Sequence, residues 1–168
     1  MSSGVAAVRI ALVLVAALAP GLAFADRFLV QGRSWTTYIN DRFGMRFDYP
    51  ANVFAPDNAP ANGDGRTFTS KDARVEIYAS RNVEGDTPAT FREKMKETEG
   101  YDEVTYSPSG DTWLVVSGFR DDMIFYEKYM FRGGVIFAFG IDFPKKRKPY
   151  YSPIVERMEN SFRPGHAD

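Results

Sequence analysis

Apolar and polar residues alternate along most of the chain after residue 33, and a period of two is typical of strands. Between positions 43 and 50, Met45, Phe47 and Tyr49 point to one side and are separated by polar residues. The preceding segment 34–40 (SWTTYIN) has the same character, and the polar residues 40–42 form a short connection. These two segments therefore predict a hairpin.

Six further segments predict strands that are joined in most places by short turns, which force neighbouring strands to be antiparallel. The last of them is apolar on both sides. This pattern predicts a central strand that is covered on both faces of the sheet. The six segments are 66–70, 73–83, 103–107, 111–120, 123–132 and 135–143.

Two helices are predicted by their starting residues. Thr87-Pro88 supplies an N-cap followed by a proline at the first helical position, and Gly100 ends that helix. Ser152-Pro153 repeats this pattern before a second apolar stripe, which ends at Pro164-Gly165. The expected fold class is therefore α+β, with an antiparallel sheet of six or seven strands and helices packed on its faces.

The stretch Pro50–Gly65 is long for a connection without secondary structure and holds three Pro, three Asn and two Gly. We expect this stretch to be either mobile or a functional surface loop. Its Asp and Asn residues do not have the spacing of a helix-loop-helix calcium site, and turn formation explains them.

The N-terminus has the pattern of a secretory signal peptide. Arg9 precedes the apolar run Ile10–Ala19, and Ala23-Phe24-Ala25 provides small residues at a cleavage site. The run is about half of the roughly 20 residues that a spanning helix needs. We expect a signal peptide at 1–25 and a single domain at 26–168 that is periplasmic or secreted, without stable membrane insertion after cleavage. A retained N-terminal anchor is the alternative, and the absence of Cys excludes a lipoprotein.

Composition narrows the possible functions. Without residues 1–25 the chain has 20 basic and 22 acidic side chains, which creates no long-range field to gather nucleic acid or an anionic membrane. The chain has no Cys, so disulfides and thiolate chemistry are excluded, and the core must come from its 14 Phe and 9 Tyr.

No catalytic or metal-binding set is recognisable. The single His166 follows the final Pro-Gly in a tail that we expect to be disordered, so neither a Ser-His pair nor a zinc or iron site is predicted. Among the carboxylates, Glu127 and Asp142 lie on predicted strands. Structural ion pairs are the favoured interpretation of these acids, and a pair of acids converging in a cleft is the alternative.

The cluster KKRK at Lys145–Lys148, followed by Pro149-Tyr150-Tyr151, gathers like charges in one place. It would suit an acidic partner, anionic lipid or a polyanion, with the tyrosines stacking. The alternative interpretation is an exposed connection between the last strand and the last helix.

Four segments carry a resemblance that extends over nearly the whole chain after residue 25: WTTYINDRFGMRFDYP, NGDGRTFTSKDARVEI, GFRDDMIFYEKYMF and YYSPIVERMENSF. They resemble a family of small exported bacterial proteins. The first and the last of these segments also resemble proteins with the PsbP-type fold, namely the extrinsic photosystem subunit and Ran-binding proteins of the Mog type. This resemblance implies an α/β/α sandwich and a role in assembly or binding, and it transfers no catalytic residue.

The favoured hypothesis is an exported, non-catalytic binding or assembly module of the cell envelope that needs no cofactor or metal. Its partner would be an envelope protein or a small ligand. A carboxylate-dependent hydrolase acting on envelope material, using Glu127 and Asp142, is the alternative, and a purely structural, stress-protective protein is a third. The candidate binding residues are Arg42, Arg46, Arg66, Lys145, Lys146, Arg147, Lys148, Tyr150 and Tyr151.

Overall fold

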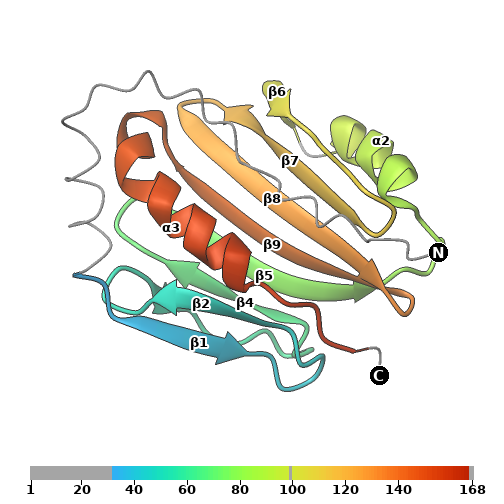
Figure 1. The fold of residues 1–168 in the computed structure, drawn as a ribbon, viewed down its shortest axis with the longest axis horizontal. Coiled ribbons are helices and arrows are strands. Elements are labelled where there is room, and N and C mark those ends of the chain that lie inside the picture. Colours follow the sequence, from blue (N-terminus) through green and yellow to red (C-terminus); the bar gives the residue numbers. More distant parts are fainter. Residues whose placement is uncertain (1–31, 99, 167–168) are drawn as a thin grey trace, which may run out of the picture.

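The computed structural model describes residues 32–98 and 100–166 (Figure 1). The predicted signal peptide at 1–25 lies outside these residues. The elements in chain order are β1 (Trp35–Ile39), β2 (Arg46–Pro50), β3 (Ala55–Pro56), β4 (Gly65–Thr69), β5 (Arg74–Arg81), α2 (Pro88–Thr98), β6 (Glu103–Tyr106), β7 (Trp113–Arg120), β8 (Met123–Arg132), β9 (Val135–Pro144), the 3-10 turn η1 (Lys145–Arg147) and α3 (Lys148–Ser161).

Seven of these strands form one antiparallel sheet with the order β3-β4-β5-β9-β8-β7-β6. The predicted α+β fold with an antiparallel sheet is confirmed. The last strand, β9, has three strands on each side and is central, as its two apolar faces predicted. Phe137 and Phe139 point to one face, and Ile136 and Ala138 point to the other; all four are buried.

One face of the sheet is covered by α3 and by the predicted hairpin, β1–β2, which forms a separate two-stranded sheet (Figure 1). Aromatic rings connect these layers. The ring of Phe47 on β2 lies 5.9 Å from that of Phe139, and the ring of Phe43 lies 6.4 Å from that of Phe137. The high Phe content therefore supplies the core on this face.

The opposite face of the sheet is covered in part by α2, which packs near β7 (Figure 1). Met95 of α2 is buried in the same apolar cluster as Ile136 and Ala138. The helix begins as predicted, because the Thr90 N–H donates to the Thr87 hydroxyl over 3.2 Å. The described chain therefore has three layers. No helix in it is long and apolar enough to cross a membrane.

The start of α3 differs from the prediction. The helix begins at Lys148, four residues before Ser152-Pro153, and Pro149 occupies its first turn. The Ser152 hydroxyl donates to the Lys148 carbonyl over 2.8 Å and does not cap the helix. A Lys-Pro pair thus starts the helix where the Ser-Pro pair was expected to do so.

The long stretch 50–65 is anchored to the fold at several points. Its short strand β3 pairs with β4, and the buried Asn40 fixes its far end. The Asn40 amide donates to the Gly63 carbonyl over 2.9 Å, and its oxygen accepts the Phe43 N–H at 2.7 Å. One side chain therefore shapes both the β1–β2 connection and the end of this stretch.

The C-terminal segment also has a defined position up to residue 166. Arg163 and Arg46 exchange backbone hydrogen bonds, and the His166 N–H donates to the Phe43 carbonyl over 2.9 Å. The prediction of a disordered tail at His166 is therefore wrong, because the segment pairs with the start of β2. The side chain of His166 is exposed.

Candidate functional site

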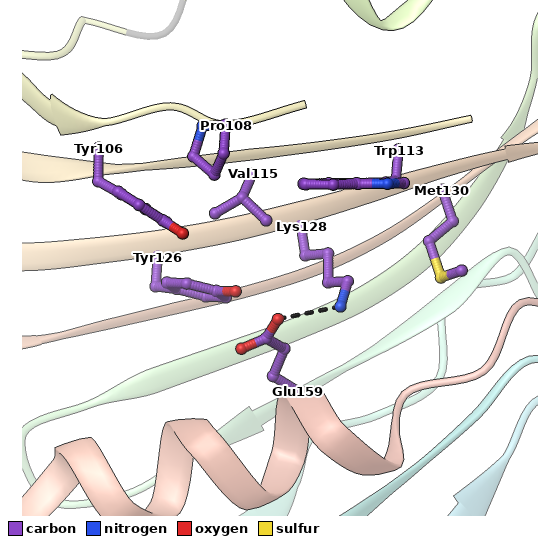
Figure 2. Close-up of a pocket in the computed structure, with 8 residues that line it drawn as sticks. All are labelled: Tyr106, Pro108, Trp113, Val115, Tyr126, Lys128, Met130 and Glu159. Atoms are coloured by element: carbon purple, nitrogen blue, oxygen red, sulfur yellow. Dashed lines mark hydrogen bonds and ion pairs between the residues drawn. The ribbon is translucent and has the colours of Figure 1, made fainter. Parts of the chain in front are cut away.

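A partly enclosed groove lies on the α3 face of the sheet, over β7 and β8 and beside the helix (Figure 2). Its volume is about 190 Å³. Its walls come from β6, β7, β8, α3 and the connection after β6. We call it the Trp113 groove, and its lining consists of Tyr106, Pro108, Trp113, Val115, Tyr126, Lys128, Met130 and Glu159.

The alternation of side chains along the strands explains why these residues meet. Trp113 of β7 is paired with Met130 of β8, and Val115 is paired with Lys128. Paired residues share a face of the sheet, so all four point to the α3 side. Tyr106 of β6 points to the same side, which makes this edge strand one wall of the groove.

An ion pair joins the sheet to the helix across the groove. The Lys128 ammonium lies 2.9 Å from the Glu159 carboxylate, and the side chains are 21% and 22% exposed (Figure 2). At this degree of burial water screens the pair only partly. We call the ion pair the charged end of the groove, and Trp113, Val115 and Met130 supply apolar atoms to its lining.

Two tyrosine hydroxyls lie near the charged end. Burial raises the pKa of Tyr126 well above its ordinary value, and the negative charge of Glu159 raises it further. Burial and the same carboxylate also raise the pKa of Tyr106. Both tyrosines therefore stay protonated at neutral pH, and the Tyr126 hydroxyl donates a hydrogen bond to Glu159. A ligand ring placed in the groove would meet aromatic faces, one carboxylate and hydroxyl groups.

The two acids considered for hydrolysis, Glu127 and Asp142, lie on the opposite face of the sheet and converge on Arg120. The guanidinium of Arg120 lies 3.2 Å from the carboxylate of Asp142 and 3.7 Å from that of Glu127. The hydroxyls of Tyr101 and Tyr129 donate to Glu127 over 2.5 and 3.0 Å. Burial raises the pKa of Asp142, and the charge of Arg120 opposes that rise.

This arrangement holds both acids as partners of one cation. It agrees with the interpretation of these carboxylates as members of structural ion pairs. The other oxygen of Glu127 is already occupied by two hydroxyls, so that acid has little capacity left for a substrate.

The nine residues proposed from the sequence do not form one site. Arg42 pairs with Asp64, and Arg66 lies with Asp64 in the lining of an open hollow of about 410 Å³ beside β4 and β5. Arg46 lies apart on β2, where its side chain is exposed. The remaining six belong to the connection from β9 into α3.

Within that connection the residues differ in accessibility. The side chains of residues 145–148 are exposed, and Tyr150 is half-buried. Tyr151 is 1% exposed, and its hydroxyl interacts with Asp72 and Ser70, so its ring packs in the core. Binding by the other residues stays a prediction.

Metal binding finds no support in the part of the chain that the structure describes. No group of three or more His, Cys, Asp or Glu side chains in that part could hold a metal ion. The Asp and Asn side chains near residue 62 instead bond to one another and to Arg42, as expected for turn residues.

Sequence reasoning did not find the Trp113 groove. The sequence did contain one indication of a site. Lys128 places a charge on the same face of β8 as Tyr126 and Met130, which line the groove. Its partner Glu159 is 31 positions away on a helix, and this proximity depends on the tertiary fold.

Comparison with known proteins gives a likeness in structure alone. No family model matches the chain, and no curated protein matches it. The solution structure of cyanobacterial PsbP (CyanoP) from Synechocystis sp. PCC 6803 is similar with a TM-score of 0.58 and 13% identity, over 79% of this chain and 93% of that one. A crystal structure from Bacteroides thetaiotaomicron covers 79% of this chain and 48% of its own, with 12% identity and a TM-score of 0.49. The resemblance to the PsbP type is confirmed at the level of the fold, and the protein has a PsbP-like fold.

Proposed function

We propose that this protein is a non-catalytic, exported binding module of the cell envelope that holds an aromatic side chain of a partner protein in the Trp113 groove. The observation that carries this proposal is a groove of about 190 Å³ with aromatic walls and a charged end. The signal-peptide pattern at 1–25 supports export. The PsbP-like fold is compatible with such a module.

The size of the groove suits one aromatic ring. An apolar cavity of about 150 Å³ in another protein binds benzene. The Trp113 groove is slightly larger, and rings in it can contact the faces of Tyr106, Trp113 and Tyr126. Such aromatic contacts add about 0.5–1.5 kcal/mol to the burial of apolar area.

The charged end favours a ring that carries a hydrogen-bond donor. Glu159 accepts from Lys128 and from the Tyr126 hydroxyl, and a phenol or indole group would bring a third donor to the same carboxylate. We therefore expect tyrosine or tryptophan side chains to bind better than phenylalanine, and alanine not to bind.

The experiment uses the two Trp residues as separate reporters. A Trp35→Phe variant keeps Trp113 as its single tryptophan, inside the groove, and is titrated with N-acetyl amides of tyrosine, phenylalanine and alanine. A saturable change in tryptophan emission is expected for tyrosine and phenylalanine, with a dissociation constant on the order of 1 mM for ligands of this size.

Two variants serve as controls. Trp113→Phe keeps only Trp35, which lies on β1 under the Arg157 guanidinium at 4.1 Å, and its emission should not respond. Val115→Phe in the Trp35→Phe background fills the groove and should abolish the response while the circular dichroism spectrum stays unchanged. An equal response to the alanine amide, or an equal response from Trp35, would refute binding in the groove.

Export is tested separately. The N-terminus of the protein recovered from the periplasm or the medium should be Asp26, as measured by intact mass. A chain recovered only in the cytoplasm, with its first 25 residues intact, would contradict this part of the proposal.

One observation favours a second candidate function, a carboxylate-dependent hydrolase acting on envelope material. The pKa of Asp142 is raised, as in many general acids, although both Asp142 and Glu127 are paired with Arg120. This candidate predicts breakdown of purified peptidoglycan that is lost in Asp142→Asn. The binding module predicts no breakdown by either protein.

A further inference from the structure

A turn rich in positive charge connects the central strand β9 to α3. We call Lys145, Lys146, Arg147 and Lys148 the basic turn, and the side chains of all four are exposed. The turn lies at the end of the sheet where β9 finishes, away from the Val135 end.

The charge of the basic turn is only partly neutralised. Arg147 lies 3.7 Å from the carboxylate of Asp72 and 4.5 Å from the centre of the Tyr150 ring. The Lys145 ammonium lies 4.4 Å from the centre of the Phe119 ring. Within residues 32–98 and 100–166, neither Lys146 nor Lys148 forms an ion pair.

The helix adds to the positive potential at this place. The N-terminal end of a helix carries a partial positive charge, which acidic residues normally offset. The first turn of α3 has no acidic residue. The basic turn therefore concentrates positive charge at a helix end that is already positive, an arrangement that disfavours folding and favours contact with an anionic surface.

The start of the described chain lies beside the basic turn. Arg33 donates to the Tyr150 carbonyl over 3.2 Å, and its guanidinium lies 4.9 Å from the centre of the Tyr150 ring, on which Arg147 also packs. The predicted signal peptide is joined to Arg33 by the seven residues 26–32. Seven residues span at most about 25 Å. While that apolar segment is in the membrane, Arg33 stays within this distance of the lipid headgroups, and the basic turn lies beside Arg33.

We propose that the basic turn docks onto an anionic phospholipid surface. The partner is a lipid surface because Arg33, which packs on Tyr150 beside the turn, is joined by a short linker to the membrane-directed segment. The overall charge of −2 after residue 25 gives no long-range attraction. Docking therefore depends on local charges within about 10 Å, the screening length at 0.1 M salt. The proposal does not depend on ligand binding in the Trp113 groove.

The test measures binding of the chain starting at Asp26, which keeps every residue that the structure describes. Vesicles of phosphatidylglycerol mixed with phosphatidylcholine are compared with vesicles of pure phosphatidylcholine by co-sedimentation at low salt. Each lysine near an anionic surface contributes about fivefold in affinity, so the triple variant Lys145→Gln, Lys146→Gln, Lys148→Gln should bind on the order of a hundredfold more weakly.

The matched control removes the same charge elsewhere. The variant Arg81→Gln, Lys96→Gln, Arg132→Gln changes three exposed cations, two of them at the opposite end of β9, and should bind as well as the unchanged chain. A variant that makes the charge near the turn more positive gives the opposite test. Exposed Asp122 lies beside Lys145, and the Lys145 N–H donates to the Asp122 carbonyl over 2.9 Å. Asp122→Asn should strengthen binding several-fold.

Binding to anionic vesicles that falls with salt, is lost in the lysine variant and increases in Asp122→Asn would support the proposal. No binding to anionic vesicles would overturn it. Equal losses in the two triple variants, or equal binding to pure phosphatidylcholine, would also overturn it. Retention on soluble polyglutamate without any vesicle binding would assign the turn to an acidic protein instead and reject a lipid surface.

Discussion

The ammonium of Lys128 on β8 lies 2.9 Å from the carboxylate of Glu159 on α3, and this pair links the helix to the sheet beside the Trp113 groove. Glu159→Gln leaves Lys128 partly buried without a counter-charge. We expect a loss of about 1–2 kcal/mol in the free energy of unfolding, measured in urea.

The exposed pair between Lys96 and Glu93 on α2 provides the control. Glu93→Gln should change stability by less than about 0.5 kcal/mol, because water screens exposed charges. Replacing Lys128 and Glu159 together with methionine should recover most of the stability lost in Glu159→Gln. If Glu159→Gln and Glu93→Gln cost the same, the pair does not hold the helix to the sheet.

Two strand glycines should respond in opposite ways to alanine. A Cβ on Gly118 of β7 would lie 1.8 Å from the Glu103 carbonyl oxygen, whereas one on Gly140 of β9 would be 3.6 Å from its nearest neighbour, the Glu127 side chain. Gly118→Ala therefore has to separate β6 from β7, at a cost of about 3 kcal/mol. Gly140→Ala fits and should stabilise the protein by up to about 1 kcal/mol.

Urea unfolding of both variants measures this difference, and the Trp113 reporter adds a second readout. Because Tyr106 on β6 forms a wall of the groove, Gly118→Ala should also weaken binding of the tyrosine amide, while Gly140→Ala should not. Equal stability of the two variants would show that β6 can move away from β7 without cost.

The layers of the fold could be predicted because each strand carries its own pattern. In β9 the apolar character of both Phe139 and Ala138 already required a strand covered on two faces, and short turns required antiparallel neighbours. The start of α3 could not be resolved in the same way. Lys148-Pro149 and Ser152-Pro153 are both acceptable starts locally, and the Ser152 hydroxyl bonds to the preceding turn of the helix.

The candidate site was harder to predict because its parts are distant in sequence. Glu127 and Lys128 are neighbours in the chain, yet they point to opposite faces of the sheet. One joins a network around Arg120 and the other pairs with Glu159. Local alternation predicts which residues share a face, but the position of α3 over that face comes from the tertiary packing.

Asp142 should make stability depend on pH in the acidic range. Burial raises its pKa above the ordinary 3.8, so the folded protein retains a proton that the unfolded chain has already lost. The folded state then binds more protons, and this group lowers stability as pH rises from about 3.8 to its raised pKa. Asp142→Asn removes this contribution, so its stability relative to the unchanged chain should improve with rising pH.

Urea midpoints at several pH values between 4 and 7 test this sign. Asp111→Asn, which removes an exposed carboxylate next to β7, controls for the loss of one charge. Asp142→Asn also changes the contact with Arg120, so the comparison concerns the slope of stability against pH and not its absolute value. Parallel pH profiles of Asp142→Asn and the unchanged chain would show that Asp142 does not titrate with a raised pKa.

Tyr151 should make stability depend on pH in the alkaline range. Burial and its hydrogen bond to Asp72 raise its pKa from 10.0 to about 12. The folded protein keeps the phenolic proton after the unfolded chain has lost it, so stability is retained up to pH 10 and declines from there to about 12. Tyr151→Phe should reduce this decline and cost about 1–2 kcal/mol at neutral pH, because Asp72 and Ser70 lose a partner.

Tyr150→Phe is the matched control, since it removes a hydroxyl from the preceding residue, whose ring packs against Arg33 and Arg147. Burial also raises the pKa values of Tyr126 and Tyr129, so part of the alkaline decline should remain in Tyr151→Phe. Unfolding midpoints between pH 7 and 11 separate these contributions. If Tyr150→Phe reduces the decline as much as Tyr151→Phe does, then the buried Tyr151 hydroxyl is not responsible for the alkaline loss of stability.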